Sequence, residues 1–175
     1  MRKIQSAVPV ILSLLALIAL ETQSFSASPS LGGISPRGIQ RGVESNLTFG
    51  GSRLADAQEI LFYSPGIEVI KLEPSDGNVI ATVKVLDNCR LGEHVAQVRT
   101  ASGVSEYRTF YVGPYGPSEE KEPNSDFNEP QPIELNTTVN GVVQNEDVDY
   151  YSVQAKKGQR IAAEVEGMRL GTALF

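Results

Sequence analysis

The segment Val79-Ile-Ala-Thr-Val-Lys-Val-Leu86 alternates apolar and polar side chains with a period of two residues. Successive side chains of a β-strand point to opposite faces, so this pattern predicts a strand with one face buried and the other in water. The turn sequence Pro74-Ser-Asp-Gly77 brings the chain into this strand. The predicted buried face consists of Val79, Ala81, Val83 and Val85.

Similar signals lie on both sides of this strand, between residues 31 and 112. Short apolar or alternating runs are separated by turn residues such as Ser64-Pro65-Gly66. The other predicted strands are Asn46–Phe49 (ending at Gly50-Gly51), Glu59–Tyr63, Ile67–Leu72, His94–Arg99 and Glu106–Val112. Strands at this spacing indicate a β-sandwich of about seven strands.

The beginning of this region resembles a family of immunoglobulin-like domains. Pro29-Ser-Leu-Gly-Gly-Ile-Ser-Pro36, then Gly42, then Leu47-Thr-Phe-Gly-Gly-Ser-Arg-Leu54 is similar to the start of IPT/TIG domains. In that family a Pro-rich first strand precedes a glycine and a strand that ends in a glycine turn. The resemblance implies an immunoglobulin-like β-sandwich over residues 28–113 that binds or spaces without catalysis.

Residues 1–27 have the composition of a secretory signal peptide. Arg2 and Lys3 precede the apolar run Ala7–Leu20, and small residues up to Ala27 offer a cleavage site. The run is short for a membrane span, which needs ~20 apolar residues; an uncleaved membrane anchor is the alternative. We therefore expect an exported protein (periplasmic, cell-surface or extracellular) with no membrane segment after cleavage. The single cysteine favours a bacterial source, because small secreted eukaryotic domains are usually rich in disulfides.

A second region follows a segment with the composition of a linker. Residues 114–126 are rich in proline, glycine and acidic residues. Further strand-like runs follow at Pro132–Leu135, Thr137–Val143, Asp149–Val153 and Arg160–Val165. We therefore predict an all-β chain of two β-sandwich modules, with no helix after the signal peptide.

This second region resembles the bacterial pre-peptidase C-terminal domain, whose pattern is Glu-Pro-Asn, a Gly-containing strand, Asp-x-Asp-Tyr-Phe/Tyr and Gly-Gln. The matching elements, in order, are Glu122-Pro-Asn124, Val139-Asn-Gly-Val-Val143, Asp147-Val-Asp-Tyr-Tyr-Ser-Val153 and Lys157-Gly-Gln-Arg-Ile161. The resemblance implies a jelly-roll-like sandwich of the kind that accompanies secreted metallo- and serine peptidases. Because such domains are longer than the stretch after the linker, we expect residues 127–175 to be the N-terminal part of one, within a fragment of a longer precursor.

The net charge of −6 is confined to the second region. Residues 1–115 are neutral in sum, whereas residues 116–175 carry 11 acidic and 5 basic side chains. An acidic balance argues against nucleic acid as a partner, because phosphate binding requires a basic face.

The same acidic residues form a candidate metal site. Calcium takes 6–8 oxygen ligands from carboxylates, amides and carbonyls. Glu120, Glu122 and Asn124 alternate in an extended segment, so their side chains point to one side. Asp147 and Asp149 lie in a loop that would join them if the linker folds back.

Calcium ligation is also what the resemblance implies. In the collagen-binding relatives, a Glu-x-Glu-x-Asn linker and an Asp-x-Asp loop contribute calcium ligands. The implied ligands in this chain are Glu120, Glu122, Asn124, Asp147 and Asp149. The alternative is that these residues are solvated, with Asp149 holding a turn through hydrogen bonds.

No catalytic constellation is evident. His94 and Cys89 lack a motif that would position a nucleophile and its base, so we predict structural roles for both. We therefore expect non-catalytic binding or spacer modules of an exported bacterial protein, within a larger secreted peptidase precursor. The alternatives are the accessory region of a subtilase-like or metallo-hydrolase whose catalytic domain lies beyond Phe175, and a cell-surface adhesion protein. The expected partners are an extracellular protein or polysaccharide, on which exposed tyrosines such as Tyr107 and Tyr111 could stack, or a cognate peptidase domain.

Overall fold

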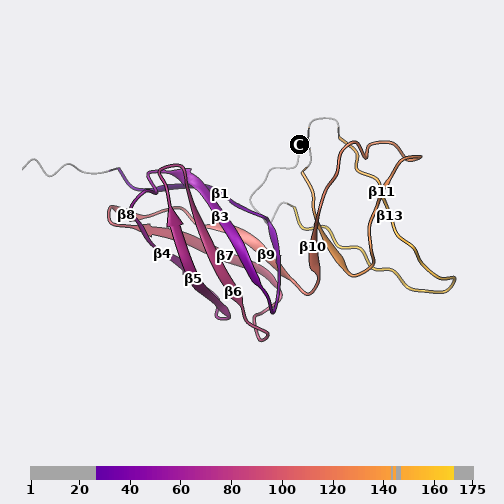
Figure 1. Cartoon of the computed structure of the whole chain (residues 1–175), viewed down its shortest axis with the longest axis horizontal. Helices are drawn as coiled ribbons and strands as arrows, with labels where there is room; N and C mark the ends of the chain where they lie inside the picture. The colour runs from indigo at the N-terminus through magenta and orange to yellow at the C-terminus, as the bar shows by residue number, and fades with distance from the viewer. Residues whose placement is uncertain (1–26, 143, 145–146, 168–175) are drawn as a thin grey trace, which may run out of the picture.

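The structure is a computed structural model that describes residues 27–142, 144 and 147–167. The predicted signal peptide up to residue 26, Val143 and the segment 168–175 lie outside the described residues. Every regular element in the described part is a β-strand, which confirms the all-β prediction. We call strands β1–β9 the first module and strands β10–β13 the second module (Figure 1).

Two sheets face each other in the first module. One is antiparallel, with strand order β1-β3-β6-β5; its strands are β1 (Ser30–Ser35), β3 (Glu44–Ser52), β5 (Ile67–Pro74) and β6 (Asn78–Val85). The other has the order β2-β9-β7-β4, with β8 paired to β7. Its strands are β2 (Gly38–Gln40), β4 (Ala57–Phe62), β7 (Gly92–Thr100), β8 (Gly103–Val104) and β9 (Arg108–Gly113). In this second sheet only β2 is parallel to its neighbour, strand β9.

The predicted buried face of the central strand β6 is confirmed. Val79, Ala81, Val83 and Val85 are all buried. They pack with Leu47 and Phe49 of β3 and with inward-facing residues of the other sheet, including Val98 and Phe110. Period-two alternation therefore places one face of each sheet in a shared apolar core, which is the arrangement of a β-sandwich.

Strand β3 is longer than the sequence predicts. The sequence predicts that it ends at Gly50 and Gly51, but the strand continues through both to Ser52 and pairs with β1. A Cβ at Gly51 would lie only 1.9 Å from the carbonyl oxygen of Ser30. The glycine therefore permits close approach of β1, and it does not mark a turn.

The second module contains two small parallel sheets. Strand β10 (Gly116–Glu119) pairs with β12 (Thr137–Asn140), and β11 (Gln131–Pro132) pairs with β13 (Tyr151–Ser152). The predicted linker thus contains a strand, and it is not wholly irregular. Pro117 lacks an N–H group, but among the described residues β10 has a single neighbour, β12, so a proline is tolerated there.

The predicted strand Arg160–Val165 does not form in this structure. These residues belong to no strand, and their side chains are exposed. The sequence alternates, but a strand also requires a neighbour with which to hydrogen bond, and no strand in the described residues pairs with this segment.

Candidate metal centre

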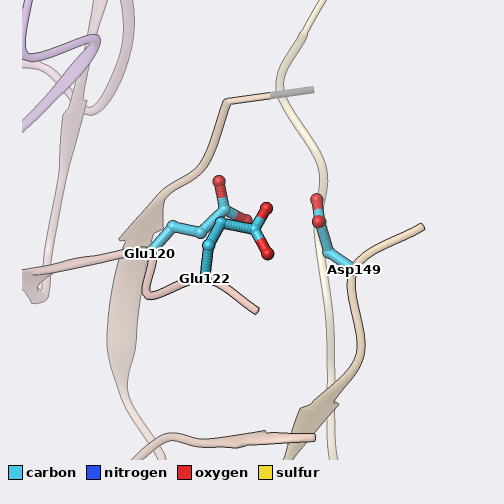
Figure 2. A group of neighbouring side chains, drawn as sticks. All are labelled: Glu120, Glu122 and Asp149. Atoms are coloured by element: carbon cyan, nitrogen blue, oxygen red, sulfur yellow. The ribbon is translucent and has the colours of Figure 1, made fainter. Parts of the chain in front are cut away.

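Three carboxylates from two distant segments meet in the second module. Glu120 and Glu122 follow strand β10, and Asp149 precedes β13. One carboxylate oxygen from each lies within 4.8 Å of the other two. Figure 2 shows the two glutamates on one chain segment and Asp149 facing them from a separate segment. Residues 120–124 therefore fold back against the Asp149 loop in this structure, which is the condition that the convergence of these acids requires.

The buried side chain of Asn124 completes this cluster. It is only 1% exposed, and its amide has two orientations with partners. In one, Nδ2 donates to Glu120 Oε1 at 3.4 Å, and the amide oxygen faces only other acceptors. In the other, the nitrogen donates to Asp149 Oδ1 at 3.2 Å and to Glu122 Oε2 at 3.1 Å. The second orientation satisfies the amide without an ion. The first directs the amide oxygen of Asn124 toward the carboxylates of Glu122 and Asp149.

Glu120 is the most heavily hydrogen-bonded acid of the cluster. Its Oε2 accepts the backbone N–H of Val142 at 2.7 Å, and its Oε1 accepts the hydroxyl of Tyr151. Burial by itself raises the pKa of Glu120, but the hydrogen bonds from Tyr151, Val142 and Asn124 outweigh it and lower the pKa. Glu120 is therefore held in the charged form that a cation requires.

Asp149 has the opposite environment. Burial first, and then the charges of Glu120 and Asp147, raise the pKa of Asp149 to about 6. Tyr151 is affected in the same sense: burial and its hydrogen bond to Glu120 raise the pKa of the hydroxyl. The site therefore concentrates negative charge beyond what its own hydrogen-bond donors compensate.

Asp147 is not part of the three-carboxylate group. Its Oδ1 accepts the hydroxyl of Ser125 at 3.2 Å, and its Oδ2 accepts the backbone N–H of Gln144 at 3.3 Å. It holds its own loop against residue 125, which is the turn-stabilising role that the sequence alternatively suggests for Asp149. The structure thus brings together Glu120, Glu122, Asn124 and Asp149 of the five expected ligands, and it places Asp147 beside them.

Tyr151 belongs to the site as well, although the sequence pattern alone does not single it out. Its hydroxyl donates to Glu120, so it orients one of the candidate ligands. A signal was available: Asp149 and Tyr151 are two residues apart in an extended segment, which places them on the same side. The ring of Tyr150 instead packs edge-on against the ring of Phe127, with the ring centroids 5.8 Å apart.

The candidate nucleophile and base of the first module are buried in its core. His94 and Cys89 are each 1% exposed. His94 Nε2 donates to the carbonyl oxygen of Arg90 at 2.7 Å and lies 3.8 Å from Cys89 Sγ. Burial raises the pKa of the Cys89 thiol and lowers that of His94, so both groups are held neutral.

Two of the tyrosines expected to stack on a polymer, Tyr107 and Tyr111, differ in exposure. Tyr107 precedes β9 and is 65% exposed, whereas Tyr111, within β9, is half-buried.

Comparisons with known proteins identify no family for this chain. No protein-family model matches it, and no curated protein matches it significantly. Among the described residues there is no helix with the length and apolar character needed to cross a membrane.

Proposed function

We propose that the described region is a non-catalytic binding or spacer unit of an exported protein, and that a calcium ion fastens its second module. The convergence of Glu120, Glu122 and Asp149 around the buried amide of Asn124 carries this proposal. The IPT/TIG-like and pre-peptidase C-terminal-like patterns of the sequence point to the same function.

The donor set suits a hard cation. Three carboxylates and one amide supply oxygen ligands only, which favours calcium or magnesium over the transition metals bound by histidine and cysteine. The ligands come from a loop and an irregular segment, and calcium tolerates variable geometry better than magnesium does. In the ion-bound state the Asn124 amide would present its oxygen, the orientation in which that oxygen already faces two carboxylates.

A non-catalytic role is supported by the placement of the nucleophilic groups. Cys89 and His94 lie in the interior of the first sandwich, where a substrate has no access to them. Their neutral forms are favoured, and neither an activated thiolate nor a proton acceptor exposed to solvent results.

The test is thermal unfolding of the chain with calcium and with a chelator. A free calcium concentration about 100 times the dissociation constant stabilises the folded state by about 2.7 kcal/mol. We therefore expect calcium to raise the unfolding temperature of the second module. Glu120→Gln keeps the shape of the side chain but removes its charge, so it should abolish most of this rise.

Glu134→Gln is the matched control, because it makes the same charge change at an exposed position in the same module. It should leave the calcium response intact. Absence of any calcium-dependent shift in the unmodified chain would contradict the proposal.

A further inference from the structure

The two modules are joined by more than a covalent connection. Strand β9 ends at Gly113 and β10 begins at Gly116, so only two residues separate them. Strand β12 then returns to the first module, where the side-chain oxygen of Asn140 accepts the backbone N–H of Gly38 at 3.1 Å. Thr138 Oγ1 donates to the carbonyl oxygen of Tyr115 in the connection at 3.4 Å.

Two glycines of the first module leave room for this contact. A Cβ at Gly38 would lie 3.2 Å from Asn140 Oδ1 and 3.4 Å from Thr138 Cγ2. A Cβ at Gly113 would lie 3.3 Å from Thr138 Oγ1. These separations are tight for carbon, so larger side chains at either glycine would push strand β12 away.

Asn140 also leads directly to the candidate metal centre. Its carbonyl oxygen accepts the backbone N–H of Glu120 at 3.3 Å, and its Nδ2 donates to Glu119 Oε1 at 3.3 Å. Two residues later, the backbone N–H of Val142 donates to the Glu120 carboxylate. One short segment therefore holds the first module at one end and a candidate cation ligand at the other.

We propose that Asn140 is a positioning residue that couples cation binding to the docking of the two modules, an inference that rests on the proposed calcium site. An ion that fixes Glu120 also fixes residues 140–142 and favours the docked arrangement. Linkage requires the converse: docking strengthens ion binding by the same factor.

The experiment compares the full chain with its Asn140→Ala variant. Calcium affinity is measured by calorimetry, and the rotational correlation time of each module by NMR relaxation of backbone amides. We expect the variant to bind calcium at least about fivefold more weakly, the lower end of ordinary coupling between sites. We also expect the two modules of the calcium-loaded variant to tumble with separate correlation times, and those of the unmodified chain with a common one.

A second variant, Gly38→Val, acts from the first module and leaves every residue of the second module unchanged. It should weaken calcium binding in the same direction, which a local folding defect around residue 140 would not explain. Asn128→Ala is the control, since the Asn128 side chain donates to Asp126 within its own turn; it should match the unmodified chain.

Equal calcium affinities and equal correlation times in the unmodified chain, Asn140→Ala and Gly38→Val would overturn this inference and leave the proposed function standing. An unmodified chain that binds no calcium in calorimetry would overturn the proposed function, and this inference with it.

Discussion

The two modules bury different kinds of side chain. The buried hydrophobic core in the described part of the chain lies in the first module, from Leu31 to Val112. The buried residues of the second module are the polar Asn124 and Gln131, while large apolar side chains such as Phe127 are exposed. Gln131 accepts from Lys121 N at 2.8 Å and donates to the carbonyl oxygen of Glu119 at 3.1 Å.

This difference separates two sources of stability. Apolar burial is non-directional and proportional to the area removed from water. Each hydrogen bond contributes only about 1 kcal/mol net, and it requires its partners to be in place. The first module should therefore respond to changes in core volume, and the second to changes in charge and in bound cations.

The largest expected effect comes from the first core. Phe110 packs edge-on against Phe62, with ring centroids 6.0 Å apart, and also contacts His94. Phe110→Ala should lower the free energy of unfolding by about 3–5 kcal/mol, measured by chemical denaturation, and calcium should not restore the loss. Tyr107→Ala, at an exposed position, should stay within about 0.5 kcal/mol of the unmodified chain. A calcium response of Phe110→Ala larger than that of the unmodified chain would contradict the assignment of this loss to the apolar core.

A smaller effect is expected where two strands approach closely. Gly51→Ala places a carbon against Ser30 and should cost about 1–3 kcal/mol by forcing β1 away from β3. Its neighbour provides the control, because a Cβ at Gly50 would meet nothing within 4 Å. Denaturation midpoints of the two variants measure the difference. Equal midpoints would show that β1 moves without cost.

The smallest expected effect is a pH dependence of opposite sign in the two modules. Burial lowers the pKa of His94 in the folded state, so below pH 6.5 the unfolded chain binds more protons and the first module loses stability. The slope is at most about 1.4 kcal/mol per pH unit. In the ion-free second module, Asp149 has its pKa raised from 3.8 to about 6, so the folded state binds more protons and gains stability as the pH falls through 6.

Amide hydrogen exchange, followed in chelator between pH 7.5 and 5, reports on each module separately. His94→Leu removes the titrating group and should flatten the profile of the first module only. A first module whose stability is unchanged between pH 7.5 and 5 would contradict the neutral, buried assignment of His94.

Much of the first module was predictable because its signals are local. Alternation at Val79, Ala81, Val83 and Val85 defined a strand and its buried face without knowledge of the partners. The same reasoning failed at Gly51, since the need for glycine there arises from Ser30, which is distant in sequence. It also missed β10, because the composition of residues 116–119 is that of a linker and the strand depends on β12.

The candidate metal centre was partly predictable for the same reason. Spacing placed Glu120, Glu122 and Asn124 on one side of an extended segment, and the structure brings them to Asp149. Spacing could not distinguish Asp147 from Asp149, because that choice depends on which carboxylate the loop turns toward Ser125.

The sequence by itself determined the all-β class, the faces of the main strands and the acidic character of the second region. Periodicity, turn residues and charge are properties of neighbouring residues, and they act before any long-range contact forms. Only the tertiary structure decided which strands pair, which acids converge and how Asn140 holds the first module. Those contacts join residues as many as 102 positions apart, and their geometry is set by the packing of the whole chain.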